Sequence, residues 1–545
     1  MTTKPATVFQ AFMQSVQQWR EHPLLVVPAS TERAYLPDGI SIGYGELAAR
    51  VQALAGLYRR SGYGHGHRVA MLLENRPEHF EHFLALNSLG ASIVPINPDY
   101  RPDEILYLLE HSDAELVVAI EARAAQLRTV AAGAPKTPPV VCAEALPDPL
   151  PRPGPAPLDG EPGLKTEAAL LYTSGTTARP KGCILSNDYH FAVGESYQTS
   201  GGMARIRPGQ ERCYNPLPLF HMNAGIFSFM GMMLSGGCSI LPDRFHPRSF
   251  WPELVQTGAT MVHYLGVIPP ILLKQPPVPE ERRHQVRFAV GAGVDPELHG
   301  AFEARFGFPL LELWGMTETG GGFIASEEPR FIDTRAFGRP TRDVEARIVD
   351  DQDRDLPTGT EGELVVRRKG PDPRRGFFSG YLKNPQATDE AWRGGWFHTG
   401  DIVRQDASGM LYFVDRKKNI IRRSGENIAA AEVEAVLQAH ERVAQAAVVA
   451  VPDELRDEEV LACVVPMAGA APGPALAREL FDWCMQRLAY FKPPGWIVFV
   501  DALPTTGTQK VQKGKLFAEG EDPRSRPGAV DLRELKKRDR PTQRG

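Results

Sequence analysis

The chain has few cysteines, no long apolar run and, outside a short C-terminal cluster, no region dominated by positive charge. Its six cysteines, spread over 545 residues, form no CxxC pair and no paired histidine spacing, so we expect neither a disulfide framework nor a structural metal site. No window is apolar for long enough to span a bilayer, and the first residues lack a charged and then apolar signal sequence. The net charge of −5 offers no basic field for nucleic acid. We therefore expect a cytoplasmic protein with reduced thiols, no integral membrane segment and no nucleic-acid partner.

The chain is long, and 42% of its residues are apolar, which is enough for one large and one smaller domain. Its first part alternates between helical and strand-like apolar spacing. Helices are predicted at residues 8–19, 44–58, 77–89 and 102–111, and strands at residues 68–73, 92–96 and 114–120. This alternation predicts an α/β fold in which parallel sheets are covered by helices on both faces. The next stretch, residues 135–162, contains ten prolines and predicts an irregular crossing over the surface.

A loop rich in hydroxyls and glycine follows the apolar run at residues 168–172 and is the strongest signal in the chain. Its candidate anion-binding residues are Thr173, Ser174, Gly175, Thr176, Thr177 and Lys181. Glycine lets the backbone turn tightly, so hydroxyls, amides and the ammonium group can all face one phosphate chain. The loop is not a Walker motif, because Pro180 precedes the lysine and Gly182 follows it. The alternative is an ordinary polar surface loop, but such loops seldom join Pro-Lys-Gly to a buried strand.

Two further stretches place candidate site residues at the ends of predicted strands. A strand at residues 286–290 runs into Gly291, Ala292 and Gly293, and a strand at residues 310–313 runs into the sequence Trp314-Gly315-Met316-Thr317-Glu318-Thr319. Ligands of open α/β sheets collect at such carboxyl ends, where loops are free to carry function. Taken alone, however, the tryptophan has a simpler explanation as a core residue, and the glutamate has one as a helix cap.

Two more candidates are weak signals when each is considered alone. His221 ends the sequence Pro-Leu-Phe-His, and a lone histidine beside an aromatic ring is by default a satisfied core residue. Asp401 closes a Thr-Gly-Asp turn, which is a common sequence. Their order along the chain, relative to the hydroxyl-rich loop, strengthens the prediction that both belong to a functional site.

In that order, the motifs resemble those of the AMP-forming adenylating superfamily, which includes acyl-CoA synthetases, free-standing adenylation domains of peptide synthetases, and luciferases. The resemblance covers roughly residues 10–517. The variant Thr-Thr-Ala-Arg-Pro-Lys-Gly, with Ala178 where glycine is common in the family, is similar to the carnitine-type CoA ligase branch. The resemblance implies a large, multi-lobed N-terminal domain with parallel sheets flanked by helices, and a small, mobile α+β C-terminal domain.

The resemblance also implies a role for each matching residue, with ATP, Mg²⁺ and coenzyme A as the bound groups. The hydroxyl-rich loop would wrap the β- and γ-phosphates of ATP, and His221 would steer the substrate carboxylate. Trp314 would stack on the adenine, and Thr317 would bond phosphate. Glu318 would ligate Mg²⁺, and Asp401 would accept hydrogen bonds from the ribose hydroxyls.

The charged sequence Asp-Arg-Lys-Lys-Asn at residues 415–419 is the predicted domain boundary, so the domains would span residues 1–417 and 418–545. By the resemblance, Arg416 belongs to the nucleotide site and Lys418 is the hinge, since hinges absorb backbone rotation at a few residues between elements. A solvated charge run at a strand end is the simpler alternative. Ser424 and Gly425 match the stretch that lines the pantetheine tunnel in the family.

The C-terminal part reads as a compact α+β unit that includes a helix at residues 430–438. Lys510 matches the family's catalytic lysine, although Gln509 replaces the usual glycine before it. By position alone this would be a surface loop with lysines. The basic stretch at residues 535–540 is expected to be a solvated end.

These features predict an AMP-forming acyl-CoA ligase that activates a small carboxylic acid, as a monomer or a homodimer. Coenzyme A is the expected acceptor, because the chain leaves no room for a carrier domain after its terminal lysine motif. A free-standing amino-acid or aryl-acid adenylating enzyme, and a nucleotide-binding regulatory protein without chemistry, remain alternatives. Short or branched, aromatic and carnitine-type acids all stay open. Candidate acyl-pocket residues are Met222, Asn223, Phe227, Gly266, Ala292, Gly321 and Gly322.

Overall fold

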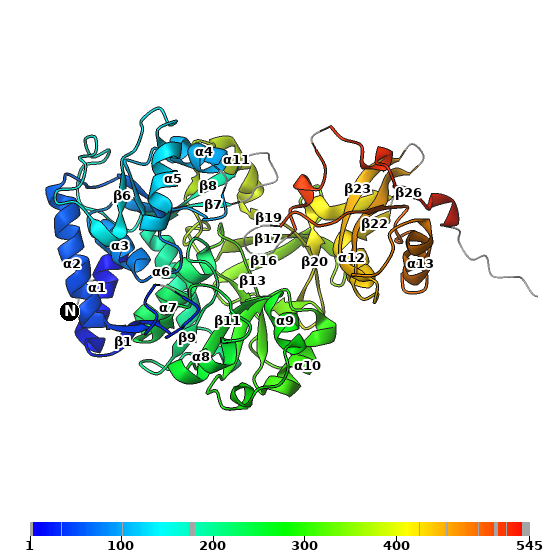
Figure 1. The fold of residues 1–545 in the computed structure, drawn as a ribbon, viewed down its shortest axis with the longest axis horizontal. Coiled ribbons are helices and arrows are strands. Elements are labelled where there is room, and N and C mark those ends of the chain that lie inside the picture. Colours follow the sequence, from blue (N-terminus) through cyan, green and yellow to red (C-terminus); the bar gives the residue numbers. More distant parts are fainter. Residues whose placement is uncertain are drawn as a thin grey trace, which may run out of the picture. The chain divides into compact units, whose positions relative to one another are not determined.

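The computed structural model describes residues 4–33, 35–100, 102–173, 180–423, 426–453, 456–488, 490–505, 511–518 and 520–536. The chain divides into two compact units, whose elements are labelled in Figure 1. The first comprises Met1–Ala346, Val366–Phe397 and Gly409–Tyr412, and the second comprises Arg347–Val365, His398–Ser408 and Phe413–Gly545. Within the described ranges, no helix combines the length and apolar character needed to cross a bilayer.

A seven-stranded sheet in the first unit has the order β18-β8-β7-β4-β3-β5-β6. Its strands are β3 (Arg68–Leu72), β4 (Ser92–Pro95), β5 (Leu116–Ala119), β6 (Val140–Cys142), β7 (Glu167–Thr173), β8 (Lys181–Ser186) and β18 (Gly380–Tyr381). β3, β4, β5 and β6 pair in parallel, and every residue of β4 and β5 is buried, as expected where helices cover both faces. β8 runs antiparallel to β7 and carries β18 on its other edge.

An eight-stranded sheet in the same unit has the order β14-β13-β12-β11-β9-β10-β1-β2. Its strands are β1 (Pro23–Val27), β2 (Ile40–Gly43), β9 (Arg212–Tyr214), β10 (Cys238–Ile240), β11 (Met261–Leu265), β12 (Phe288–Ala292), β13 (Leu310–Gly315) and β14 (Gly322–Ile324). The six strands from β13 to β1 pair in parallel, whereas β14 and β2 pair antiparallel at the two edges. The carboxyl ends of β12 and β13 therefore meet at one edge of the sheet, as the sequence predicts.

Eleven α-helices are described in the first unit, where they accompany these sheets (Figure 1). They are α1 (Val8–Trp19), α2 (Tyr44–Arg60), α3 (Glu78–Asn87), α4 (Pro102–Ser112), α5 (Glu121–Ala131), α6 (Asn187–Gln198), α7 (Phe229–Ser235), α8 (Phe250–Thr257), α9 (Ile268–Lys274), α10 (Pro296–Phe306) and α11 (Pro385–Ala391). Local signals define their ends: Thr7 caps α1 by accepting from the amide of Gln10, and α10 ends at Gly307, which takes the left-handed conformation with φ of 85°. Apolar residues of α4 and α5, among them Leu108 and Leu127, pack against β3, β4 and β5.

A five-stranded sheet has the order β15-β20-β19-β17-β16. Its strands are β15 (Ala336–Gly338), β16 (Val344–Val349), β17 (Glu361–Arg368), β19 (Phe397–Gln405) and β20 (Leu411–Arg416). The division of the chain into two units falls within β16, β17, β19 and β20.

The C-terminal part of the second unit is an α+β structure, as the sequence predicts. Its sheet has the order β22-β21-β24-β25-β26, with β23 also paired to β24. The elements are β21 (Ile420–Arg423), β22 (Glu426–Ala429), α12 (Ala430–Gln438), β23 (Val443–Asp453), β24 (Asp457–Pro466), α13 (Pro474–Met485), β25 (Trp496–Phe499) and β26 (Val530–Asp531). Val433 and Leu437 of α12 and Leu480 of α13 pack with Val448 and Val460 in one apolar core.

The predicted helices at residues 8–19 and 430–438 are confirmed with the same bounds. The proline-rich stretch is not irregular throughout, because β6 lies within it and pairs in parallel with β5. The expectation of a solvated end at residues 535–540 is wrong for Lys536, whose side chain is fully buried and forms an ion pair with Glu459. The reason is that Glu459 is itself fully buried and requires cationic partners, which the local sequence of the tail cannot reveal. Residues 537–540 lie outside the described residues.

Candidate active site

Two motifs that are far apart in the sequence meet at Tyr381 in the first unit. The ammonium group of Lys181, from the hydroxyl-rich loop motif, lies 4.8 Å from the centroid of the Tyr381 ring. The Tyr381 hydroxyl donates a hydrogen bond of 2.9 Å to Oε1 of Glu318, from the stretch after β13. The loop lysine and the predicted metal ligand are therefore brought together around one phenol ring.

The strand pairing explains why these groups meet. Thr173 and Lys181 are register partners in the β7–β8 pair, so both ends of the hydroxyl-rich loop are fixed. β18 pairs with β8 on the opposite edge, with Tyr381 opposite Cys183. Because Lys181 and Cys183 are two residues apart on one strand, their side chains lie on the same face. The loop residues Ser174, Gly175, Thr176 and Thr177 lie outside the described residues.

The Thr317-Glu318 turn is held from α6 and has little contact with solvent. The hydroxyl of Tyr189 donates to the carbonyl oxygen of Thr317 at 2.7 Å, and Glu318 is 7% exposed. Burial, followed by the charge of Glu318, raises the pKa of the Cys183 thiol well above its ordinary value, and the same two causes raise the pKa of Tyr381. Both neighbours of Glu318 therefore stay protonated.

The donor set suits a magnesium ion that arrives with a nucleotide. Among the described residues, no group of three or more histidine, cysteine, aspartate or glutamate side chains is arranged to hold a metal ion. Mg²⁺ is commonly bound by one or two carboxylates together with substrate phosphates and waters. One buried carboxylate beside a loop lysine fits that mode of binding and does not fit a resident structural metal.

The glycine stretch at the end of β12 is tied to a buried carboxylate that the sequence analysis missed. β12 spans Phe288–Ala292, so this strand begins and ends two residues later than predicted and includes Gly291 and Ala292. The amide of Gly293 donates to Oε2 of Glu312 at 2.8 Å, and the Tyr264 hydroxyl donates to Oε1 at 2.5 Å. Burial raises the pKa of Glu312. A charged residue in the middle of the apolar sequence Leu-Leu-Glu-Leu-Trp was the available signal.

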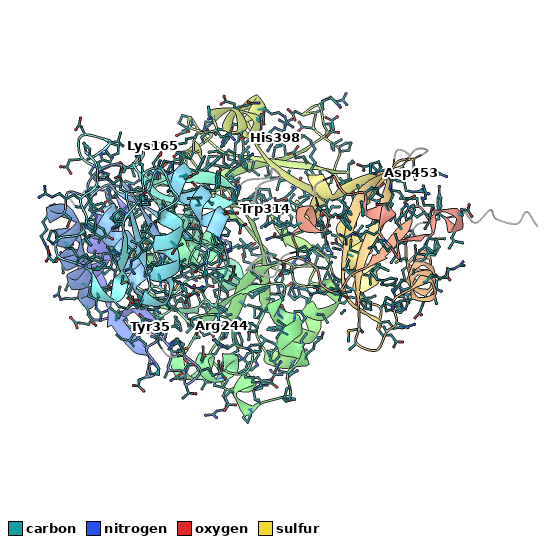
Figure 2. The ribbon with its side chains drawn as sticks, turned by 45° about the horizontal axis from the view of Figure 1, so that its top comes forward. Tyr35, Lys165, Arg244, Trp314, His398 and Asp453 are labelled. Carbon is teal, nitrogen blue, oxygen red and sulfur yellow. The ribbon has the colours of Figure 1, made fainter. Side chains whose placement is uncertain are left out.

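Trp314 lies in the interior of the first unit with 7% of its surface exposed (Figure 2). Its indole ring stacks on Phe323 of β14, with 5.3 Å between ring centroids and 20° between planes. This contact covers part of the indole, as the core interpretation expects. The predicted stacking of Trp314 on adenine stays a prediction.

His221 is half-buried and lies in a tight turn before an irregular helix. Its amide donates to the carbonyl of Pro218 at 3.1 Å, and its carbonyl accepts from the amide of Gly225 at 2.9 Å. A π-helical segment, Asn223–Ser228, follows directly, and such segments are frequent at functional sites. The predicted role of His221 in steering the carboxylate stays a prediction.

Behind this segment lies a buried polar network that the sequence did not indicate. Oδ1 of Asn223 is 2.7 Å from Nδ1 of His263, and it also accepts from the side-chain amide of Asn215 at 3.1 Å. Nε2 of His263 is 2.8 Å from the hydroxyl of Tyr197. Burial lowers the pKa of His263 to about 3, so its ring is neutral and can act as donor on one side and acceptor on the other. The network fixes the orientation of the Asn223 amide.

In the second unit, Asp401 and Arg416 form an ion pair. Asp401 is 1% exposed, and its Oδ1 lies 2.8 Å from Nε of Arg416. The turn before it is fixed by the Thr399 hydroxyl, which donates to the carbonyl of Leu364 at 2.7 Å. The two predicted nucleotide-site residues of this unit are therefore brought together, and Arg416 orients the carboxylate of Asp401.

Glu363 stabilises the same turn from the other side. Its Oε1 accepts from the amide of Gly400 at 3.1 Å, and its Oε2 accepts from Nζ of Lys417 at 3.0 Å. Burial alone would raise the pKa of Glu363, but the interactions with His398, labelled in Figure 2, and Lys417 outweigh it and lower the pKa to about 2. Sequence reasoning missed Glu363 because it lies about forty residues before Asp401 in the chain.

The remaining predicted site residues are described in part or not at all. Lys418 lies in a short 3-10 turn, Lys417–Asn419, directly after β20. Ser424, Gly425 and Lys510 lie outside the described residues, so their predicted roles stay predictions.

The comparisons with known proteins agree with this geometry. Residues 12–382 match the AMP-binding enzyme family, and residues 432–510 match the AMP-binding enzyme C-terminal domain. A crotonobetaine/carnitine–CoA ligase from Citrobacter koseri is 32% identical over 87% of this chain and 92% of its own length. A sulfoacetate–CoA ligase from Cupriavidus necator is 32% identical over 92% of this chain and 95% of its own.

Solved structures show the same fold. The o-succinylbenzoate CoA synthetase of Bacillus subtilis, in complex with its acyl-adenylate intermediate, has a TM-score of 0.78 and 25% sequence identity, covering 94% of this chain and 98% of that one. The predictions of an α/β fold and of a resemblance to AMP-forming adenylating enzymes, including the carnitine-type branch, are confirmed. The chain belongs to the AMP-binding enzyme family.

Proposed function

We propose that the chain is an AMP-forming acyl-CoA ligase, with the residue roles set out below. It activates a small carboxylic acid with MgATP to an acyl-adenylate and pyrophosphate, and then transfers the acyl group to coenzyme A with release of AMP. The observation that carries this proposal is the convergence of Lys181 and Glu318 on Tyr381. It joins the phosphate-loop motif to the Thr-Glu motif, which is the pairing that nucleotide activation requires.

In this proposal, each group manages charge on the nucleotide. The hydroxyl-rich loop and Lys181 hold the β- and γ-phosphates, and Thr317 bonds the phosphate that is attacked. Magnesium, when bound at Glu318, neutralises charge that develops on the transferred phosphate. Lys510 supplies a further positive charge there, and His221 orients the attacking carboxylate.

Two parts of the second unit have separate roles in this proposal: the part before residue 418 binds the ribose, and residues 418–545 give access to the acceptor. Asp401, oriented by Arg416 at 2.8 Å, accepts hydrogen bonds from the ribose hydroxyls. We place the functional boundary between residues 417 and 418, with Lys418 as the hinge about which residues 418–545 turn between the two half-reactions. Ser424 and Gly425 then line the path of the pantetheine thiol.

The relatives support coenzyme A as the acceptor, since the two named above are CoA ligases of small carboxylic acids. They do not favour an amino-acid adenylating enzyme or a regulatory protein. We propose a cytoplasmic setting, which agrees with six cysteines that are all free thiols and all buried. The oligomeric state is proposed as a monomer or a homodimer.

The test is a carboxylate panel assayed with purified protein, MgATP and coenzyme A. The expected result is that pyrophosphate and AMP are released only when an acid is present, and that AMP release requires coenzyme A. Pyrophosphate release without dependence on coenzyme A would point to a free-standing adenylating enzyme. Nucleotide binding without pyrophosphate release in the presence of any acid would overturn the proposal that the chain is an enzyme.

A further inference from the structure

The side-chain amide of Asn223 lies at the edge of the eight-stranded sheet that carries the predicted site of adenylation. Asn215, which contacts it, directly follows β9, and β9, β11, β12 and β13 are consecutive parallel strands of that sheet. Their carboxyl ends therefore share one edge, and the Thr317-Glu318 turn follows β13 at the same edge. Ligands of open α/β sheets bind outside such ends. Asn223 is thus placed on the side of the sheet where an acid would be activated.

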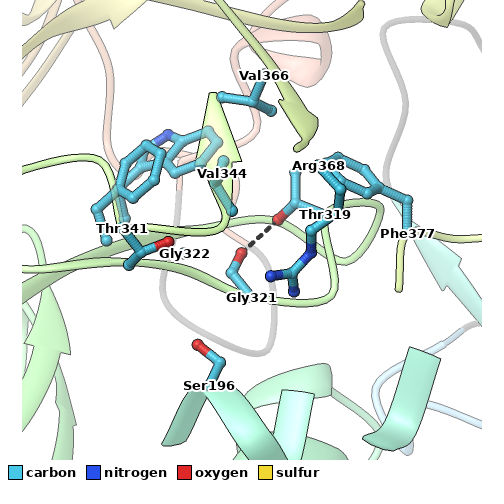
Figure 3. A pocket seen from close by; sticks show the side chains of 11 residues that line it. Ser196, Thr319, Gly321, Gly322, Thr341, Val344, Val366, Arg368 and Phe377 are labelled. Carbon is cyan, nitrogen blue, oxygen red and sulfur yellow. Dashed lines mark hydrogen bonds between the residues drawn. The ribbon is translucent and has the colours of Figure 1, made fainter. Parts of the chain in front are cut away.

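Helix α6 links the loop after β13 to the polar network around Asn223. Figure 3 shows Ser196 of α6 facing Gly321, and a Cβ atom at residue 321 would meet the Ser196 hydroxyl oxygen at 3.5 Å. Oγ1 of Thr319 donates to the carbonyl of Gly321 at 2.6 Å, the bond drawn in the same figure. The next residue of α6, Tyr197, donates to the network instead. Adjacent residues of one helix therefore support the loop and the network.

One backbone amide decides which way the Asn223 side chain is turned. The amide of Leu217 donates to Oδ1 of Asn215 at 3.0 Å, so the other end of the Asn215 side chain must be its NH2 group. That NH2 group donates to Ser228 at 2.9 Å and to Oδ1 of Asn223 at 3.1 Å. Turning the Asn223 amide over would bring two NH2 groups against each other in a buried place. The oxygen of Asn223 therefore faces inward.

His263 requires the same orientation from the other side. Its Nδ1 lies 2.7 Å from Oδ1 of Asn223, so Nδ1 carries the proton, and the fully buried ring is neutral. Nε2 is then an acceptor, and it receives the hydroxyl of Tyr197 at 2.8 Å. Every donor of the network meets an acceptor in this arrangement. The position of each proton follows from the single Leu217 amide.

The NH2 group of Asn223 is left directed away from the network. Asn223 is half-buried, and within the described ranges its Nδ2 forms no hydrogen bond and does not belong to the polar atoms that are sealed from solvent. A neutral NH2 group has two N–H donors and no acceptor. It can bind an oxygen of a ligand and has nothing to offer an ammonium group. The sheet edge thus presents one oriented donor.

We propose that Asn223 recognises the acyl chain of the substrate as a fixed hydrogen-bond donor, and that the enzyme selects acids whose chain carries an acceptor oxygen, such as a carbonyl, over acids with a purely hydrocarbon chain. Asn215 and His263 act as positioning residues. The inference rests on the proposed function, because it takes this edge as the place where an acid is activated. A site built to hydrogen-bond a substrate group rejects the analogue that lacks it, since the site's own polar group is then left unpaired.

The test uses pairs of acids in which a methyl group replaces a carbonyl oxygen. The oxo acids 4-oxopentanoate, 5-oxohexanoate and 4-acetylbenzoate are assayed beside 4-methylpentanoate, 5-methylhexanoate and 4-isopropylbenzoate. The measurement is kcat/KM, from pyrophosphate release in the presence of coenzyme A. In the pair whose oxygen reaches Asn223, the wild-type protein is expected to prefer the oxo acid by about 3–10-fold, the value of a neutral hydrogen bond.

Asn223→Asp exchanges the outward donor for an acceptor. The carboxylate keeps one oxygen for Asn215 and His263 and places a second oxygen where the NH2 group was. The ratio of oxo acid to methyl acid is expected to fall below one, through the KM for the oxo acid, with the KM for ATP unchanged. Asn384→Asp is the matched control, because the Asn384 oxygen caps α11 by accepting from the amide of Ala387 at 3.0 Å, which a carboxylate does equally well.

Asn215→Asp tests the positioning role at a residue that does not touch the substrate. The carboxylate still accepts from the Leu217 amide, but it has no N–H for Asn223. The Asn223 amide must then turn over and present its oxygen outward, so the same reversal of preference is expected. A merely structural role would lower kcat/KM for both acids of a pair by the same factor. Asn223→Asp, at a half-buried position, decides the case if Asn215→Asp does not fold.

The outcomes separate this inference from the function on which it rests. The inference is overturned if the wild-type protein prefers no oxo acid over its methyl partner, or if Asn223→Asp changes both members of each pair by the same factor. Acid-dependent pyrophosphate release would continue in either case, so the ligase function would stand. Absence of release with every acid of these pairs and of a wider set would instead remove the proposed function.

Discussion

The Tyr381 hydroxyl donates a 2.9 Å hydrogen bond to Glu318, and the same ring lies under the ammonium group of Lys181. One aromatic residue on a two-residue edge strand thus links two motifs that are more than a hundred residues apart in the sequence. The bond orients the carboxylate that we propose as the magnesium ligand. A residue with no assigned role in the sequence analysis therefore organises the proposed metal site.

Replacing Tyr381 by phenylalanine should weaken magnesium binding while keeping the ring beneath Lys181. Loss of a hydrogen bond to a metal-binding carboxylate commonly costs about 10–100-fold in metal affinity or activity. The expected result is a slower adenylation rate and a higher magnesium requirement, measured by pyrophosphate release against Mg²⁺ concentration. Tyr63→Phe is the control, since its hydroxyl donates to the carbonyl of Pro151 at 2.9 Å elsewhere in the unit. An unchanged magnesium dependence in Tyr381→Phe would remove Glu318 as the ligand.

Lys510→Ala should slow the first half-reaction far more than the second. We propose that this lysine contacts the nucleotide only in the arrangement that forms the adenylate, and loss of such a preorganised charge costs ~10²–10³ in rate. The two halves are measured separately, by ATP-dependent pyrophosphate release and by thioester formation from supplied acyl-adenylate. Lys515→Ala, at an exposed neighbouring position, is the matched control. Equal losses of rate in both half-reactions would show that Lys510 does not act specifically in adenylate formation.

Lys418→Pro should allow adenylate formation and block thioester formation. Proline fixes φ, so a hinge at this residue cannot complete its rotation between the two half-reactions. Release of pyrophosphate in a single turnover should continue, while AMP release with coenzyme A should stop. Turnover to thioester at the wild-type rate would show that the chain turns elsewhere.

Buried neutral histidines should make the first unit sensitive to acid. Burial lowers the pKa of His79 to about 3, with His82 adding to it, and burial lowers the pKa of His82 and His190 to about 4 and of His263 to about 3. The unfolded chain binds these protons near pH 6.5, so it holds more protons than the folded chain below that value, and stability falls as the pH drops from 6.5 toward 4. Each histidine should cost about 2 kcal/mol at pH 5.

The measurement is the free energy of unfolding of the first unit between pH 5 and pH 7. His190→Phe should reduce the steepness of the loss by about 1 kcal/mol per pH unit, because one proton fewer is bound on unfolding. His65→Phe is the control, since that ring lies partly at the surface. The same pH slope in wild type and His190→Phe would show that the His190 ring is charged in the folded state.

The sequence predicted much of the fold because local patterns and tertiary structure agree in it. Helix α1 follows apolar spacing after a threonine cap, and the strands β3 to β5 are mainly apolar and almost entirely buried. The short strand β6 escaped notice because prolines on both sides dominate its neighbourhood. Its three residues gain their structure from pairing with β5, a contact that no local pattern contains.

Site residues were predicted where they belong to a motif of contiguous residues. Lys181 and Glu318 belong to motifs, whereas Tyr381, Glu312 and Glu363 each contact a motif that is distant from them in the chain: Tyr381 contacts Glu318, Glu312 contacts Gly293 and Glu363 contacts Gly400. The specific partners of such residues follow from strand order and register, which the alternation of elements does not fix. The burial of Lys536 beside Glu459 was missed for the same reason.

Asp401→Asn should impair the recognition of ribose and little else. Asp401 is 1% exposed and is held by Arg416 at 2.8 Å, so the asparagine would stay in place but present one donor where an acceptor is needed. If both ribose hydroxyls donate to this carboxylate, the KM for ATP should rise about 10–100-fold, as for other charge-assisted bonds, with the KM for the acid unchanged. Asp406→Asn, in the exposed turn after β19, is the control.

The decisive measurement repeats the comparison with 2′-deoxy-ATP and 3′-deoxy-ATP. The wild-type protein should use both analogues less well than ATP, because each lacks a hydroxyl that would donate to Asp401. Asp401→Asn should discriminate much less between ATP and the analogues, because the carboxylate that accepts from these hydroxyls has been removed. A purely structural ion pair with Arg416 would raise the KM for ATP and for its deoxy analogues by the same factor, and that result would remove Asp401 from the ribose site.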